Sequence, residues 1–221
     1  MYYLLILSII ITISAQLYIN STYNKYSKEL SKSGKTAAEA ARIILDNNGL
    51  SNVKVKEVSG FLTDHYDPRK KEVRLSSSNY NSQSISAVSV ASHECGHAIQ
   101  DKENYYFLRL RASLIPLVNF SSYAGYFAIL FGILFGSLNL VWLGIIAELV
   151  ILLFQFITLP VEFNASKRAL KEIEKYNILN KSELEKGQKV LTSAALTYVA
   201  SVATTIIEIL RLILIFSDRR D

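Results

Sequence analysis

Residues 114–159 read LIPLVNFSSYAGYFAILFGILFGSLNLVWLGIIAELVILLFQFITL, and Glu148 is the only charged residue among them. An α-helix needs about 20 consecutive apolar residues to cross the hydrocarbon core of a bilayer. The stretch therefore predicts two transmembrane helices, 114–136 and 139–159, joined by an uncharged turn at Ser137. Because two crossings return the chain to the side from which it came, the segments before and after this hairpin are expected on one side of the membrane.

Two further apolar stretches lie near the ends of the chain. Residues 1–19 contain no charged side chain, and no basic residue precedes Lys25, whereas a cleaved signal peptide begins with basic residues. We interpret residues 1–19 as an uncleaved transmembrane anchor. Residues 190–216 form a fourth apolar helix, in which Glu208 and Arg211 are spaced to pair within the helix. The sequence predicts a mainly α membrane protein with about four transmembrane helices.

The polar segment 20–112 has the patterns of a small α+β domain. Thr36 and Glu39 form a capping-box signature in front of a helix at 37–47. Alternating apolar residues predict short strands, and an Asp-Pro pair predicts a turn between two of them. The expected strands are 53–58, 61–66 and 72–76, with the turn at 67–70.

A second helix is expected at the end of this domain, and a third polar segment follows the hairpin. Ser82 or Ser84 can cap a helix that runs through Gln100. Its apolar residues Ile85, Val88, Cys95 and Ile99 follow one another at spacings of three, seven and four residues. These spacings place them on one face of a helix, so they predict one buried stripe. The third polar segment, 160–189, is rich in Lys and is expected to be helical.

The distribution of basic residues indicates the orientation of the chain. Residues 20–112 contain 14 Lys or Arg against 10 Asp or Glu, and residues 162–189 contain 7 against 5. The amino terminus and the turn at Ser137 contain none, and loops rich in Lys and Arg stay in the cytoplasm. Arg219 and Arg220 oppose this orientation, because four crossings would place them outside. We expect a multi-pass protein of the cell membrane whose polar domain faces the cytoplasm.

The overall charge and the cysteine content exclude other classes of protein. The net charge is +5, but the basic residues flank apolar segments and form no stripe with stacking aromatics, so no nucleic-acid partner is expected. Cys95 is the only cysteine, which rules out an internal disulfide and a thiolate zinc knuckle. The expected partners are the lipid bilayer and a peptide or membrane-protein substrate, and the sequence does not indicate an oligomeric state.

Residues 93–97 read HECGH, the H-E-x-x-H pattern of zinc peptidases, on a predicted helix. His93 and His97 are one helical turn apart, so both imidazoles can bind the same ion. Glu94 lies about 100° around the helix, where it can act as a general base without binding the metal. In such sites zinc lowers the pKa of a bound water to about 7, and the carboxylate accepts its proton. We therefore expect one zinc ion per chain.

A catalytic zinc site usually has three protein ligands and one open position. No third histidine follows His97 at the spacing of the extended motif, so the third ligand must come from elsewhere. Glu162 is the first choice, since the 114–159 hairpin returns the chain to the side of the H-E-x-x-H helix. His65, just before the turn at 67–70, is the alternative, with a half-exposed strand position or a substrate-facing role as competing interpretations.

The sequence resembles a family of bacterial membrane-spanning neutral zinc metallopeptidases from Ser33 onward. The resemblance is carried by four blocks in the same order, LTDHYDP at 62–68, HECGHAIQ at 93–100, LPVEFNAS at 159–166 and AALTYVA at 194–200. It implies a metal-dependent peptidase and leaves the substrate open.

The site is more distantly similar to gluzincin membrane proteases of the heat-shock and CAAX-prenyl-endopeptidase types. Those enzymes also place a helical hairpin between H-E-x-x-H and a glutamate ligand, in a segment that commonly reads E-x-x-A-D. Glu162 and Ala165 match that segment, but Ser166 replaces the acidic residue, so the support of one histidine ligand must differ. Tyr198 is a candidate transition-state donor, with packing at the entry of the last span as the alternative.

These patterns predict a membrane-bound zinc metalloendopeptidase in which His93, His97 and Glu162 bind zinc and Glu94 is the general base. The segment 61–66 could receive substrate by strand addition. Cleavage inside the membrane is a competing reaction, but the helix before His93 is serine-rich and amphipathic, and no L-D-G block follows. The non-enzymatic alternative is a membrane zinc-binding scaffold or regulatory protein without peptidase turnover.

Overall fold

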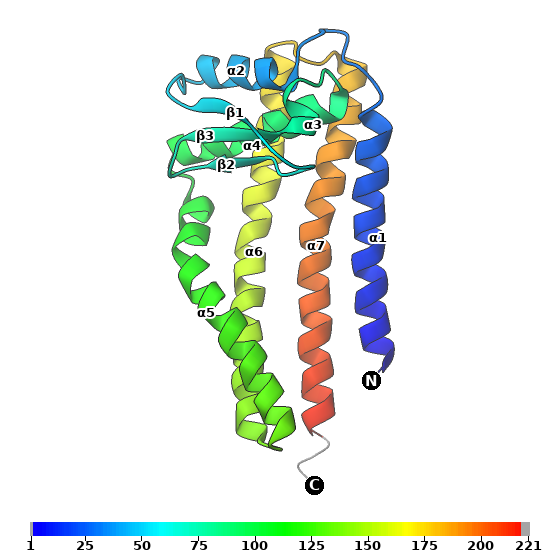
Figure 1. Cartoon of the computed structure of the whole chain (residues 1–221), viewed down its shortest axis with the longest axis vertical. Coiled ribbons are helices and arrows are strands. Elements are labelled where there is room, and N and C mark those ends of the chain that lie inside the picture. The colour runs from blue at the N-terminus through cyan, green and yellow to red at the C-terminus, as the bar shows by residue number, and fades with distance from the viewer. Residues whose placement is uncertain (1, 218–221) are drawn as a thin grey trace. The chain divides into compact units, whose positions relative to one another are not determined.

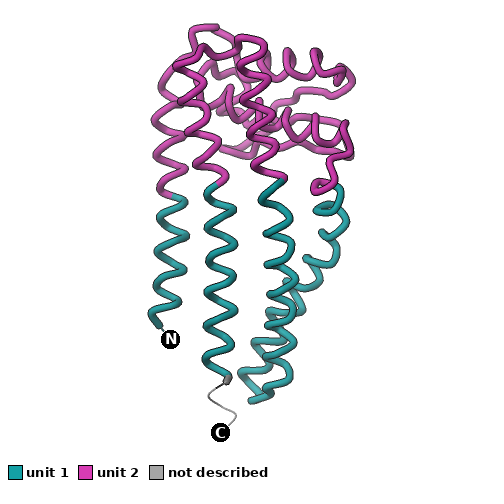
Figure 2. The backbone as a smooth tube through the Cα atoms, turned by 180° about the vertical axis from the view of Figure 1, so that it is seen from behind, with its two compact units in different colours: residues 1–16, 109–160, 196–221 teal, residues 17–108, 161–195 magenta. Residues whose placement is uncertain are grey.

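The computed structural model describes residues 2–217, so Arg219 and Arg220 lie outside the described part of the chain. The elements follow one another along the chain as seven helices and three strands within that range (Figure 1). The chain forms two compact units, coloured separately in Figure 2. Unit 1 contains residues 1–16, 109–160 and 196–221, and unit 2 contains residues 17–108 and 161–195.

Four helices are long and apolar enough to cross a membrane, as the sequence predicts. They are α1 (Tyr2–Tyr26), α5 (Tyr106–Leu134), α6 (Leu138–Lys175) and α7 (Lys181–Ser217). In unit 1, α5 and α6 form the predicted hairpin, and small residues let them approach closely, since a Cβ on Gly125 would lie 2.8 Å from the Ala147 methyl. The turn between them contains Gly136 at φ 65°, a left-handed conformation that glycine adopts without strain.

In unit 2, the α+β domain begins with α2 (Ala37–Asn47), which has the predicted capping box. The Thr36 hydroxyl accepts a hydrogen bond from the Glu39 N–H, and the Glu39 carboxylate accepts one from the Thr36 N–H. The sheet has the order β1-β3-β2, with β1 (Lys54–Val58) parallel and β2 (His65–Asp67) antiparallel to β3 (Glu72–Ser76). The fold class is confirmed as a mainly α membrane protein with a small α+β domain.

The second predicted strand is shorter than expected. Only His65–Asp67 is extended, because Gly60 at φ 117° and Leu62 at φ 54° turn the backbone away from strand geometry. The predicted turn is present, and the Asp67 carboxylate accepts hydrogen bonds from the N–H groups of Arg69 and Lys70.

Two helices extend beyond the apolar stretches that predicted them. α6 runs through Pro160 to Lys175, so the segment that carries Glu162 continues the second helix of the hairpin. α7 begins at Lys181, where the Asn180 side chain accepts a hydrogen bond from the Glu183 N–H and so caps the helix. The segment 160–189 is therefore helical except for the connection between α6 and α7.

Candidate metal centre

Helix α4 (Ile85–Lys102) carries the H-E-x-x-H residues in unit 2. Ser84 caps it by accepting a hydrogen bond from the Ala87 N–H, which decides between the two predicted caps. The predicted apolar stripe of α4 is buried in the core of the domain, with Ile85, Val88, Cys95 and Ile99 at most 4% exposed. Burial of this face turns His93 and His97 toward α6, with their ring centroids 4.7 Å apart.

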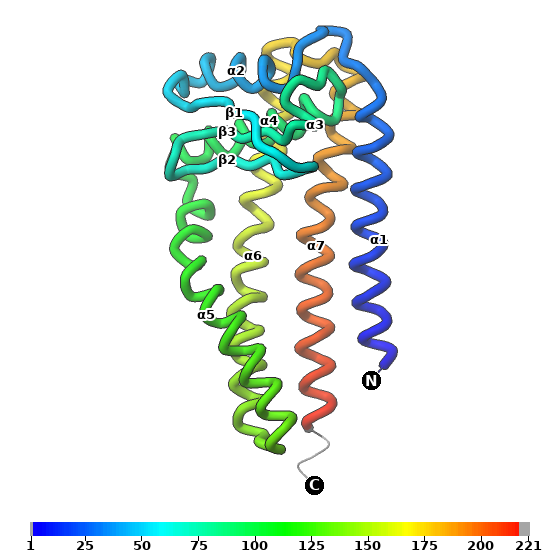
Figure 3. The backbone as a smooth tube through the Cα atoms, in the orientation of Figure 1, coloured from blue at the N-terminus to red at the C-terminus, as the bar shows by residue number. Residues whose placement is uncertain are grey.

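Glu162 reaches the two histidines from α6. Its Oε2 atom lies 3.3 Å from His93 Nε2 and 3.6 Å from His97 Nε2, and the three candidate ligand atoms all lie within 4.8 Å of one another. The chain leaves unit 2 after residue 108, near the start of α5, and returns to it at residue 161, within α6. Figure 3 traces this path from α4 through α5 to α6. The structure thus brings together the three residues that the sequence proposed as ligands.

The arrangement fits a zinc ion in donor type and in size. Zinc binds imidazole nitrogen and carboxylate oxygen at about 2.0–2.2 Å, so tetrahedral ligand atoms lie about 3.4 Å apart. The separations from Glu162 to His93 and His97 are 3.3 and 3.6 Å. The His93 and His97 side chains are 15% and 12% exposed, so water can reach the centre.

Gly96, inside the motif, allows α4 and α6 to approach closely enough for Glu162 to reach the histidines. A Cβ at this position would collide with the backbone carbonyl of Ala165, one turn after Glu162. Ala165 is itself completely buried. The clash would be with backbone atoms, which cannot turn aside as a flexible side chain can. A larger residue at position 96 could therefore be accommodated only by moving one helix.

Replacing Gly96 with alanine is therefore expected to lower both stability and zinc affinity. Overpacking of a well-packed contact typically costs about 1–3 kcal/mol, and a displaced α6 would carry Glu162 away from the histidines. Zinc bound per chain and the thermal unfolding midpoint test this. Val90→Ala, at a half-buried core position on the same helix, should lose stability and keep zinc. Wild-type zinc affinity in Gly96→Ala would contradict the role of this contact.

The second nitrogen of each histidine has a polar partner. Ser166 Oγ lies 3.1 Å from His93 Nδ1, and the Gln100 side-chain oxygen lies 3.0 Å from His97 Nδ1. Such partners fix the orientation of an imidazole and direct its other nitrogen to the metal. Ser166 therefore supports His93, and Gln100 supports His97.

Gln100 also connects α4 to α6, a role that the sequence analysis did not identify. Its side chain is completely buried, and its amide nitrogen donates to the Val161 carbonyl at 2.8 Å and to the Asn164 side-chain oxygen at 3.0 Å. Arg168 Nε donates to the same Asn164 oxygen at 2.7 Å. The sequence did hold a signal for this role, because Gln100 lies three residues after His97 and residues three apart share a helix face.

Glu94 is 8% exposed and does not belong to the cluster of candidate ligands. Its Oε2 atom accepts a hydrogen bond of 2.9 Å from the Tyr66 N–H on β2. Among residues 2–217 this is the only hydrogen bond of the Glu94 carboxylate. The Glu94 carboxylate therefore extends from α4 to the edge strand β2.

The electrostatics of the centre favour an ionised carboxylate at Glu162. Burial acts to raise its pKa, but hydrogen bonds from His93 and His97 outweigh burial and hold the pKa below the usual value.

Cys95 lies in the core beside Ala41, and burial, followed by the charge of Glu94, raises the pKa of its thiol well above the usual value. A neutral, buried thiol is not a metal ligand.

Two residues of the predicted site lie outside this cluster. His65 is exposed on β2, where its Nδ1 lies 2.8 Å from the Thr63 carbonyl oxygen, and it is not among the candidate ligands. Tyr198 is half-buried on the part of α7 that belongs to unit 1. The suggested substrate contacts of His65 and Tyr198 remain predictions.

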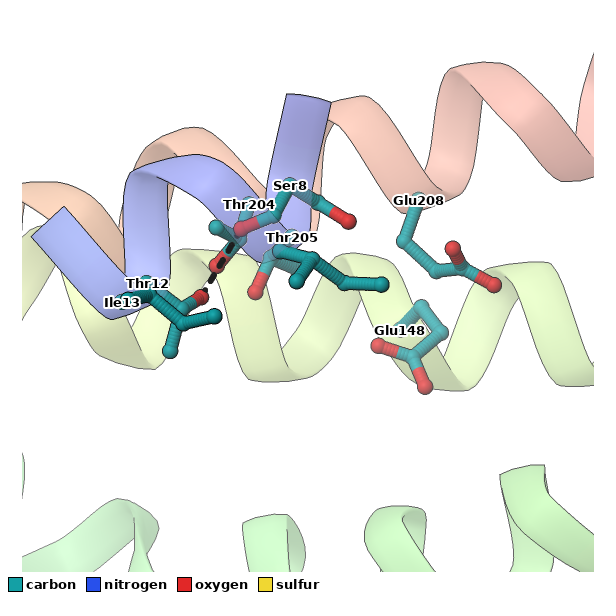
Figure 4. Close-up of a pocket in the computed structure, with 8 residues that line it drawn as sticks. Ser8, Thr12, Ile13, Glu148, Thr204, Thr205 and Glu208 are labelled. Carbon is teal, nitrogen blue, oxygen red and sulfur yellow. Dashed lines mark hydrogen bonds between the residues drawn. The ribbon is translucent and has the colours of Figure 1, made fainter. Parts of the chain in front are cut away.

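Unit 1 contains a separate open groove among its apolar helices, to which several polar side chains contribute. The groove has a volume of about 370 Å³ and is lined by Ser8, Ile9, Thr12, Ile13, Glu148, Thr204, Thr205 and Glu208. Glu148 on α6 and Glu208 on α7 extend toward the same space (Figure 4). Glu208 accepts a hydrogen bond of 2.8 Å from Arg211 Nε, which confirms the pairing predicted within this helix. The polar residues that α1 contributes were not anticipated from the sequence.

Comparison with known proteins agrees with the metal-binding geometry. Residues 1–217 match the family described as "Putative neutral zinc metallopeptidase". The chain is 51% identical over 207 residues to a Bacillus subtilis (strain 168) protein named "Putative membrane protease YugP", with 94% of this chain and 92% of that protein covered. No solved structure matches the chain.

The family match confirms the resemblance found in the sequence and implies zinc, for which the cluster of His93, His97 and Glu162 could supply the ligands. The four apolar helices and the name of the Bacillus relative indicate a multi-pass membrane protein. The chain belongs to the family of putative neutral zinc metallopeptidases.

Proposed function

We propose that the protein is a membrane-bound zinc endopeptidase of the H-E-x-x-H type that hydrolyses peptide bonds. The observation that supports this most directly is the convergence of His93, His97 and Glu162, with ligand atoms within 4.8 Å of one another. Glu94 lies on the same helix, buried but outside the ligand cluster. Three ligands and a neighbouring carboxylate are the set that a gluzincin-like site requires.

Each residue has a defined task in the proposed reaction. His93, His97 and Glu162 would hold zinc, which when bound acts as a Lewis acid that polarises a peptide carbonyl and acidifies water. Glu94 takes a proton from the attacking water and then delivers it to the leaving nitrogen. Ser166 and Gln100 keep the two imidazoles in the orientation that ligation needs.

Strand β2 is the proposed contact for an extended substrate. The sheet order leaves β2 at an edge, and edge strands pair readily with an added peptide strand. The Tyr66 N–H on β2 points to Glu94, so a peptide added there would lie beside the proposed base. The substrate class we propose is therefore an unfolded or extended segment of a peptide or membrane protein.

Metal removal tests the proposed function. Purified protein reconstituted in lipid should cleave an unfolded reporter peptide, lose this activity after treatment with a chelator, and recover it when zinc is added back. Activity depends on the metal because no protein side chain at the centre can replace the Lewis acid. Cleavage that persists in metal-free protein, or zinc-loaded protein that cleaves no peptide or membrane substrate, would contradict a zinc peptidase.

We further propose that unit 2 and its metal centre face the cytoplasm, because the polar segments carry the excess of Lys and Arg. Cysteine labelling with a membrane-impermeant reagent tests this, since the native Cys95 is completely buried. Asn52→Cys, at an exposed position of unit 2, should react only after cells are permeabilised. Ser137→Cys in the hairpin turn should react in intact cells, and the reverse pattern would place the site outside.

A further inference from the structure

Tyr66 contacts helix α4 through two different groups. Its backbone N–H donates to Glu94 Oε2 at 2.9 Å, and its phenol OH donates to Asp101 Oδ2 at 2.8 Å. Glu94 and Asp101 are seven residues apart, about two helical turns, so they lie on nearly the same face of α4. Tyr66 of the edge strand therefore contacts α4 at two points, about two helical turns apart.

Asp101 of α4 is buried and binds the β2–β3 hairpin. Its side chain is 2% exposed, and its Oδ2 atom also accepts a hydrogen bond of 2.5 Å from Lys71 Nζ. Lys71 directly precedes β3 and has φ 52°, so it lies where the turn ends. Asp101 thus holds both arms of the β2–β3 hairpin, and the Lys71 ammonium compensates the cost of burying its charge.

The contact with Tyr66 restricts Glu94. A glutamate side chain has several rotatable bonds, and without a partner its carboxylate would sample other rotamers. The Tyr66 N–H is the only hydrogen-bond donor to this carboxylate among the residues that the structure describes. A general base must be within hydrogen-bond reach of the proton that it takes, so its orientation affects turnover directly.

We propose that Tyr66 is a positioning residue for Glu94, and that Asp101 fixes Tyr66 through the phenol OH. This inference rests on the proposed function, in which Glu94 is the general base. Tyr66 would act on the rate of the chemical step, because the strand places its N–H where it selects one orientation of the carboxylate. Zinc binding should be independent of it, since Tyr66 and Asp101 are not among the candidate ligands.

The experiment is a double-mutant cycle with Tyr66→Phe and Glu94→Gln in zinc-loaded protein. Tyr66→Phe removes the OH that reaches Asp101 and keeps the ring that packs on the core. We expect kcat to fall about 5- to 30-fold, the range for one hydrogen bond of moderate strength, with KM and zinc per chain unchanged. In the Glu94→Gln background the same change should have no further effect, because the base is already missing.

Tyr80→Phe is the matched control, since Tyr80 packs against the same core and makes no hydrogen bond through its OH among residues 2–217. It should keep the wild-type kcat. Asp101→Ala is the second variant, because alanine removes the oxygen that accepts the hydrogen bond from the Tyr66 OH, and it should lower kcat with the same dependence on Glu94. An unchanged kcat in Tyr66→Phe, an equal fall in the Glu94→Gln background, or a loss of zinc would overturn the inference. Full turnover in Glu94→Gln alone would instead overturn the proposed function.

Discussion

Glu94→Gln is expected to lower kcat for peptide cleavage to a small residual rate while the protein keeps its zinc. Glutamine has nearly the same shape and can still accept the Tyr66 N–H hydrogen bond, but it cannot accept a proton. General acid–base catalysis contributes about 10²–10⁴-fold, so kcat should fall by that factor or more. Turnover of a fluorogenic peptide and zinc per chain, measured on the same preparation, check the two halves of this expectation.

Glu57→Gln is the matched control for this experiment, because Glu57 is exposed on β1 in the same unit. It should retain wild-type turnover and zinc. A Glu94→Gln variant that cleaves peptide at the wild-type rate would show that Glu94 is not the base. If the wild type and the variant both bind zinc and neither cleaves any substrate, the scaffold alternative would be supported.

Glu162→Ala is expected to lower zinc affinity more than any other single change on α6. Loss of a supporting partner costs about 10–100-fold in affinity, and loss of a ligand should exceed that range. The two histidines would remain, so the variant should bind zinc weakly instead of not at all. Competition with a chelator of known affinity measures the dissociation constant directly.

Two variants distinguish ligand loss from general damage. Glu172→Ala removes another buried carboxylate of α6, one that accepts a hydrogen bond from Asn48, and it should retain zinc. His65→Ala removes the alternative third ligand, which is exposed on β2, and it should also retain zinc. Undiminished affinity in Glu162→Ala together with lost affinity in His65→Ala would reverse the assignment.

Features governed by local chemistry could be predicted from the sequence. The capping box of α2 depends on two side chains three residues apart, and its helix has the predicted bounds. The proximity of Glu162 to His93 is a long-range contact, yet it followed from a topological argument, since an apolar hairpin returns the chain to its starting side. The predicted hairpin and the fold class were accessible because membrane crossing constrains helix length.

Other features depend on contacts that no local pattern reveals. The strand at 61–66 was overpredicted because alternation of apolar residues does not record the left-handed backbone at Leu62. The demand for glycine at position 96 comes from the Ala165 carbonyl, almost seventy residues away. The contacts of Tyr66 with Glu94 and Asp101 likewise require knowledge of how β2 packs on α4.

The most direct test of the metal centre is anomalous scattering at the zinc edge from crystals of the zinc-loaded protein grown in lipid. We expect one peak per chain, about 2.0–2.2 Å from an imidazole nitrogen of His93, an imidazole nitrogen of His97 and a carboxylate oxygen of Glu162. A peak bound by other residues, a peak that Glu162 does not contact, or no peak in zinc-loaded protein would contradict the proposed centre.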